Sequence, residues 1–279
     1  MAQRISRVAL WVAAAALATF GLFSFALPQQ ASEQFPWRVG PFLAMTIGGW
    51  AIGMAAMAAQ TAVTWRVERV LPGLATLWVF GIGEIVVALL FLDKLVVTLL
   101  TIPYLTGLVA LVASAVAGLA WLASERPSLR GTGRPAPIHL RLAALGFIAL
   151  VGALAFLTAF APQGGATTEG RVFPEQMTLF SAQAFAAFFA SLTAAGLVLL
   201  VSSTTVAAYR FYSTVGLMLI APITLAALLN IGLFDFSGQP GHAAYLGAYV
   251  VVGLGALGLL FFHRREREMD TAQTPAAAE

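Results

Sequence analysis

The chain has 279 residues, of which 60% are hydrophobic and 10% are charged. Soluble domains carry about 25% charged residues, so this composition excludes a soluble globular protein and indicates an integral membrane protein surrounded by the lipid bilayer. The absence of cysteine excludes disulfides, thiolate catalysis and Cys-ligated metal or iron–sulfur sites. The net charge of +3 comes from basic residues clustered between apolar segments, which act as topology signals and do not indicate nucleic-acid binding.

Eight segments are long and apolar enough to span a bilayer, which takes about 20 mostly apolar residues. They cover residues 8–27, 42–64, 74–92, 95–123, 140–161, 177–208, 211–236 and 243–263. The first segment also fits a signal peptide, because Arg4 and Arg7 precede an apolar stretch with a small-x-small ending. We favour a retained helix, because residues 142–161 have the same character deep inside the chain.

The distribution of basic residues predicts the orientation. Twelve of the fifteen Lys and Arg residues lie at the chain ends or in the connections after the second, fourth and sixth segments. The three exceptions are Arg38, Lys94 and Arg171. By the positive-inside rule both termini face the cytoplasm, which requires an even number of spans. We therefore expect the protein in a prokaryotic cytoplasmic membrane.

The two halves of the chain share an ordered set of residues. The matching pairs are Pro28-Gln29 with Pro162-Gln163, Phe35-Pro36 with Phe173-Pro174, Tyr104-Leu105 with Tyr245-Leu246, and Glu125-Arg126 with Glu266-Arg267. This order predicts two four-helix repeats, residues 1–123 and 140–263, joined by a cytoplasmic linker at 124–139 and followed by a disordered tail at 264–279. Because four is even, the repeats are expected to be parallel, related by a pseudo-two-fold axis along the membrane normal.

Glu84 is the main candidate for a functional residue. It is the one acidic residue inside a predicted span, about ten residues or roughly 15 Å of helix from either end, which places it near the bilayer midplane. A carboxylate there costs several kcal/mol, about 2.5–3.5 on insertion scales, unless it is hydrated or paired. Glu84 is therefore a candidate proton, ion or substrate site, with Tyr104 and Asn230 as possible partners. The structural alternative is a neutral carboxyl hydrogen-bonded to a neighbouring helix.

The two polar loops on the predicted outer face supply the other candidates. Trp37 and Arg38 lie in the first loop and Arg171 in the second, so the loops form either interfacial turns or an external lid that attracts anions. We expect Glu175 to complement the helix dipole at the start of the following helix in the second repeat.

Established catalytic and cofactor motifs are absent from the sequence, including the Walker, Gly-x-Ser-x-Gly, His-Glu-x-x-His and dinucleotide-binding motifs. No two of the histidines at 139, 242 and 263 are spaced for haem or zinc ligation. We expect no cofactor, no metal and no catalytic residue.

Three functional hypotheses remain. The first is a small-solute or proton-coupled transporter or channel with Glu84 in a central, hydrated cavity. The second is a non-catalytic scaffold or accessory subunit of a membrane-protein complex, or a homo-oligomer. The third is a lipid-modifying enzyme, which is least favoured because it normally needs two or more polar catalytic groups at one depth.

Overall fold

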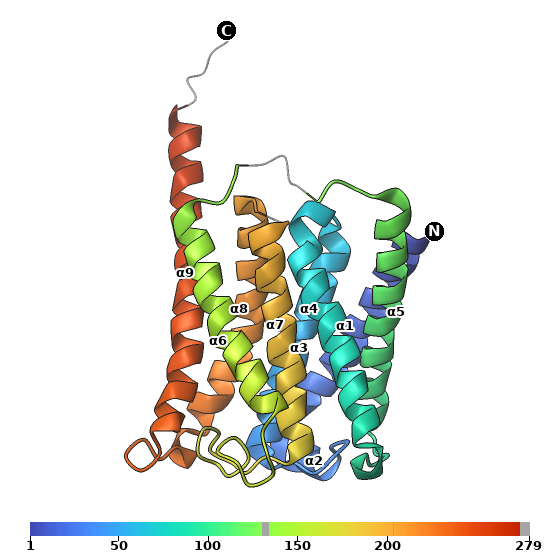
Figure 1. Cartoon of the computed structure of the whole chain (residues 1–279), viewed down its shortest axis with the longest axis vertical. Coiled ribbons are helices and arrows are strands. Elements are labelled where there is room, and N and C mark those ends of the chain that lie inside the picture. Colours follow the sequence, from blue (N-terminus) through green and yellow to red (C-terminus); the bar gives the residue numbers. More distant parts are fainter. Residues whose placement is uncertain (130–133, 203, 274–279) are drawn as a thin grey trace.

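The protein is an α-helical membrane protein. A computed structural model describes residues 1–129, 134–202 and 204–273 (Figure 1). Eight of the helices in these ranges are long and apolar enough to cross a membrane. They are α1 (Ala2–Ala26), α3 (Pro41–Thr64), α4 (Val67–Leu90), α5 (Thr101–Glu125), α6 (Ile138–Ala159), α7 (Leu179–Val201), α8 (Val206–Leu229) and α9 (Pro240–Gln273).

The connections between these helices contain three short helical turns, which are α2 (Pro28–Glu33), η1 (Leu92–Lys94) and η2 (Ile231–Leu233). Met1 and the C-terminal end of α9 lie at one end of the bundle, which we call the terminus face (Figure 1). The connections at 27–40, 91–100, 160–178 and 230–239 lie at the opposite end, which we call the α2 face.

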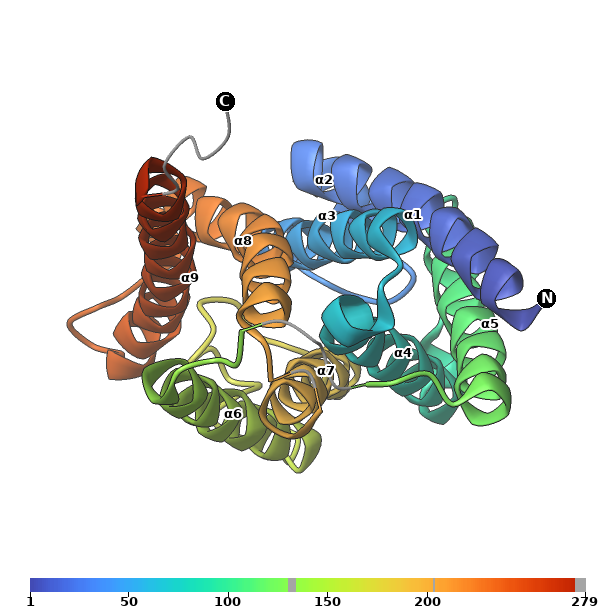
Figure 2. The same cartoon turned by 90° about the horizontal axis from the view of Figure 1, so that it is seen from above.

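Four helices form the centre of the bundle. Figure 2 shows α3, α4, α7 and α8 in the middle, with α1 and α5 on one side and α6 and α9 on the other. The two halves meet where α3 packs on α8 and α4 packs on α7. A Cβ atom at Gly53 of α3 would lie 2.4 Å from the Cα atom of Leu219 in α8, so the two backbones approach as closely as a glycine allows.

The eight predicted spans are confirmed, but several of their boundaries were wrong, and two of them have a clear physical reason. The third span begins at Val67 and not at residue 74, because the helix continues through its polar first turn, where Glu68 complements the helix dipole. The sixth span ends at Val201 and not at residue 208, because Thr205 caps the next helix by accepting a hydrogen bond from the backbone N–H of Ala208 at 3.4 Å.

The predicted linker and tail are described in part. Residues 130–133 of the linker, with Arg130, lie outside the described residues. The remaining linker pairs with the α7–α8 turn, because the backbone N–H of Ala136 donates to the Thr204 oxygen at 2.7 Å. Helix α9 continues to Gln273 and overlaps the predicted tail, whose residues 274–279 also lie outside the described part.

Candidate functional site

Glu84 and Tyr104 form a buried pair. The Tyr104 hydroxyl donates to Glu84 Oε2 at 2.9 Å, and the two residues are 2% and 3% exposed. Glu84 lies on α4 and Tyr104 on α5, so this bond links adjacent helices. The sequence named both residues as candidates, and the structure brings them together.

Glu84 lies nearer to one end of its helix than predicted. Glu84 lies six residues before Leu90, the last residue of α4, and Tyr104 lies three residues after Thr101, the first residue of α5. At a rise of about 1.5 Å per residue, Glu84 is about 9 Å from the α2-face end of its helix and about 26 Å from the other end, so it lies off the helix centre. The difference follows from the early start of α4, whose polar first turn the hydropathy pattern does not reveal.

A very small cavity adjoins the pair. Its volume is about 10 Å³, enough for about one water molecule. Its walls come from α1, α3, α4, α5, α7 and the loop before α3, and include Trp37, Trp50 and Phe80. Glu84 Oε1 and Trp50 Nε1 have no hydrogen-bond partner among the described residues. This cavity is far smaller than the central, hydrated cavity expected around Glu84, and the bond from Tyr104 on the neighbouring helix matches the structural alternative stated for this residue.

Trp37 covers this cavity from the α2 face. Its ring lies in an aromatic cluster, with ring centroids 5.4 Å from Tyr104, 4.7 Å from Phe35 and 4.3 Å from Phe180. Its indole N–H donates to Ser181 Oγ at 2.9 Å, and its side chain is buried. The stacking and the hydrogen bond together fix the orientation of the indole ring.

A vestibule of about 1010 Å³ opens on the α2 face directly beyond Trp37. Arg38, Lys94 and Glu169 contribute its charged side chains, and Gln163, Thr168, Gln176 and Thr178 contribute neutral polar ones. Trp37 lines both the vestibule and the small cavity at Glu84. Lys94 pairs with Asp93 at 2.9 Å, and this hydrogen bond lowers the pKa of the Asp93 carboxyl.

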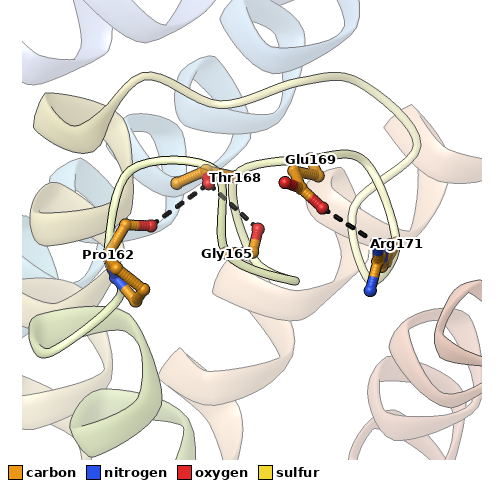
Figure 3. Close-up of polar contacts among 5 residues, drawn as sticks. All are labelled: Pro162, Gly165, Thr168, Glu169 and Arg171. Atoms are coloured by element: carbon orange, nitrogen blue, oxygen red, sulfur yellow. Dashed lines mark hydrogen bonds and ion pairs between the residues drawn. The ribbon is translucent and has the colours of Figure 1, made fainter.

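The loop at residues 160–178 forms one wall of the vestibule through a compact turn (Figure 3). Thr168 Oγ1 donates to the carbonyl oxygens of Gly165 at 2.9 Å and Pro162 at 3.4 Å. Arg171 pairs with Glu169 at 3.2 Å. Arg171 does not line the vestibule, so only Trp37 and Arg38 of the three predicted loop residues do so.

Glu175 binds a different helix from the one expected. Its Oε1 and Oε2 atoms accept the backbone N–H groups of Phe42 at 3.3 Å and Leu43 at 3.0 Å, at the start of α3. Helix α7 is instead capped by Thr178, which accepts from the backbone N–H of Ser181. Glu175 therefore connects the second loop to the first half of the chain, a tertiary contact that local sequence spacing does not reveal.

Asn230 lies apart from the Glu84 pair. Its side-chain amide donates to the Ala226 oxygen at 2.9 Å and to Met45 Sδ at 3.4 Å, at the end of α8. Trp50, which lines the cavity at Glu84, and Ser181, which accepts the indole N–H of Trp37, were not predicted. Both lie in apolar segments without a motif, so their spacing gives no signal.

The arrangement places a buried carboxyl group and a phenol in contact beside a space for about one water molecule. A carboxyl group in such a pair can bind and release a proton. Within the part of the chain that the structure describes, no three His, Asp or Glu side chains gather at a potential metal site. A comparison of the chain with protein families, curated proteins and solved structures finds no match.

Proposed function

We propose that this protein is a proton-coupled transporter of a small solute, in which Glu84 exchanges the proton and the structure represents a closed state. The observation that carries the proposal is the position of Trp37, whose side chain lines both the vestibule and the cavity at Glu84. One aromatic side chain thus lies between a large polar opening and a buried carboxyl group.

The arrangement of helices supports this proposal. The second and third spans of each half form the central contacts, because α3 packs on α8 and α4 packs on α7. This pattern is the one that two parallel four-helix repeats would give. With both termini in the cytoplasm, as the basic residues predict, the vestibule opens to the outside.

The proposed cycle starts with a movement of Trp37. Displacement of the indole breaks its hydrogen bond to Ser181 and connects the vestibule with Glu84. Water then reaches Glu84 Oε1, which has no partner among the described residues, while the Tyr104 hydroxyl continues to hold Oε2. A buried carboxyl group is stable when neutral, so loss of its proton requires this hydration.

Access to the cavity is the first test. Because the chain contains no cysteine, a single introduced cysteine can be labelled without background. Val39→Cys lies in the vestibule and Ala184→Cys in the cavity at Glu84. We expect a membrane-impermeant maleimide to label Val39→Cys rapidly and Ala184→Cys slowly, and Trp37→Ala to accelerate only the second reaction. Equal labelling of Ala184→Cys with and without Trp37 would show that this side chain does not close the cavity.

Proton flux is the second test. Purified protein in liposomes with a trapped pH dye should carry protons across the membrane when at least one member of a panel of small solutes is added on one side. Glu84→Gln should abolish this flux, whereas Glu68→Gln, a carboxylate at the other end of the same helix, should preserve it. Flux that is absent from the wild type, or unchanged in Glu84→Gln, would refute the proposal and favour a scaffold role.

A further inference from the structure

The side chain of His242 joins two loops at the α2 face. It lies in the first turn of α9, two residues after Pro240, and is 3% exposed. Its Nδ1 atom lies 2.9 Å from the backbone nitrogen of Asp235 in the loop at 230–239. Its Nε2 atom lies 2.7 Å from the carbonyl oxygen of Gly170 in the loop at 160–178. One buried imidazole therefore connects the start of α9 to both loops.

These two partners fix the protonation state of the ring. The backbone N–H of Asp235 can only donate, so Nδ1 must accept and carries no proton. The carbonyl oxygen of Gly170 can only accept, so Nε2 must carry a proton and donate it. The form of His242 that satisfies both partners is the neutral Nε2–H tautomer. In the charged imidazolium both nitrogens are donors, so this form can keep Gly170 but must lose the Asp235 N–H.

The nearest charged group is the carboxylate of Asp235, which is close enough to interact with a charged His242. Its Oδ1 atom accepts the backbone N–H of Gly238 at 2.8 Å and the hydroxyl of Ser237 at 2.9 Å. To pair with an imidazolium, the carboxylate would have to leave these two donors. Protonation of the ring therefore breaks contacts of the loop at 230–239 whether or not the carboxylate turns toward it.

The other elements around the ring contribute no uncompensated charge. Glu169 and Arg171 flank Gly170 in the second loop and pair with each other at 3.2 Å. The Glu175 carboxylate accepts two backbone N–H groups at the start of α3. The described residues of α9 from 240 to 262 include no Asp, Glu, Lys or Arg. Protonation of the imidazole is thus the change of charge that these contacts register most directly.

We propose that His242 is a pH-sensitive latch, whose neutral ring holds the loop at 230–239 against the start of α9 and whose protonation releases this loop at Asp235. Histidine is the side chain that changes charge between about pH 5 and 8. Burial adds to the effect, because a charged group away from water is costly and an open loop admits water. This inference does not rest on the proposed transport function.

The released loop also contacts the first half of the chain. Phe234 precedes Asp235 and is 8% exposed. Its ring centroid lies 5.6 Å from that of His242 and 5.7 Å from that of Phe42, the second residue of α3. Opening of the loop would therefore reach a contact between the two halves. The latch makes that contact sensitive to the pH at the α2 face.

Hydrogen–deuterium exchange of the full chain in nanodiscs tests the latch. Protection of the Asp235 amide, after correction for the intrinsic exchange rate at each pH, should fall at least about fivefold between about pH 8 and about pH 5, the effect of about one net hydrogen bond. The pKa of the Asp235 carboxyl is lowered by its bonds from Gly238 and Ser237, so this carboxyl keeps its charge over the range. The control amide is that of Lys94, which donates to the Phe91 oxygen at 2.9 Å in the η1 turn and should stay constant.

Variants separate the imidazole from the rest of the loop. His242→Gln presents an amide that accepts through its oxygen and donates through its N–H at every pH, so Asp235 should stay protected throughout. His242→Phe keeps a ring without nitrogens and should leave Asp235 unprotected at every pH. The matched control is His139→Gln on α6 at the terminus face, which should retain the pH response of the wild type.

Three outcomes would overturn the proposal. Constant protection of Asp235 in the wild type from about pH 8 to about pH 5 would show that protonation does not open the loop, and this measurement needs no variant. The same pH response in His242→Gln would assign it to another group. An equal loss of protection at Lys94 would indicate general loosening of the α2 face. None of these outcomes depends on proton flux through Glu84.

Discussion

The contact between Glu175 and the start of α3 can be tested from both of its sides. Glu175→Ala removes the carboxylate that accepts the backbone N–H groups of Phe42 and Leu43. Gly40→Ala should remove the same contact indirectly, because its Cβ atom would lie 2.4 Å from Glu175 Oε2. The backbone at Gly40 has a φ angle of −83°, which alanine adopts without strain.

The expected cost follows from the two hydrogen bonds. Loss of a capping side chain destabilises a protein by about 0.5–2 kcal/mol, and a hydrogen bond to a charged group contributes about 1.5–3 kcal/mol. We expect Glu175→Ala and Gly40→Ala each to lower the free energy of unfolding by about 2 kcal/mol. In the absence of Glu175, Gly40→Ala should be neutral or stabilise by about 0.4–1 kcal/mol, because it restricts the unfolded chain.

A double-mutant cycle provides the measurement. Unfolding of the four proteins in detergent micelles can be followed by intrinsic tryptophan fluorescence during denaturant titration. The control is Glu169→Ala, which removes only an exposed ion pair in the same loop and should change stability by less than about 1 kcal/mol. Equal costs of Gly40→Ala with and without Glu175 would refute the assigned contact, because independent sites are additive.

Three further predictions follow from other contacts. Tyr104→Phe leaves both oxygens of Glu84 without a protein donor and should reduce stability by about 1–3 kcal/mol, measured by the same unfolding assay. Gly53→Ala should lower the free energy of unfolding in detergent by more than about 2 kcal/mol, because its Cβ atom would meet the α8 backbone. Hydrogen bonds from the Gly238 N–H and the Ser237 hydroxyl lower the pKa of the Asp235 carboxyl. They therefore stabilise this turn fully at pH values above the pKa that Asp235 has in the unfolded chain. That stabilisation is lost as the pH falls through the folded pKa, and faster hydrogen exchange at Gly238 at acidic pH would report it.

Hydropathy and helix length could predict the eight spans, because each span must satisfy its backbone hydrogen bonds within one apolar helix. The ends of the spans could not be predicted in this way. They depend on caps such as Thr205 and on polar first turns such as the one with Glu68, where apolar character and helical structure do not coincide. The early start of α4 alone moves Glu84 from the expected centre of its helix toward one end.

The candidate site was predictable in part. A lone carboxyl group in an apolar span indicates Glu84, and Tyr104 follows as a donor on the next span. The positions of Trp37 and Trp50 beside this pair depend on how a loop and α3 fold against α1, α4 and α7. Asn230 was predicted as a partner of Glu84 from its polarity alone. It lies elsewhere, because polarity does not indicate which helices are neighbours. The binding of Glu175 to α3 depends in the same way on contacts between distant segments.

In the proposed transport cycle, the Glu175 contact would set where the two halves separate. It ties the loop at 160–178 to the first half at the α2 face, so a rocking motion that preserves it has its pivot there. The α4–α7 contact would then widen most at the terminus face, near Trp65 and Ser202. Spin labels at Trp65 and Ser202 would record this widening as an increase in the distance between them. The distance between two labels placed on either side of the Glu175 contact should not change.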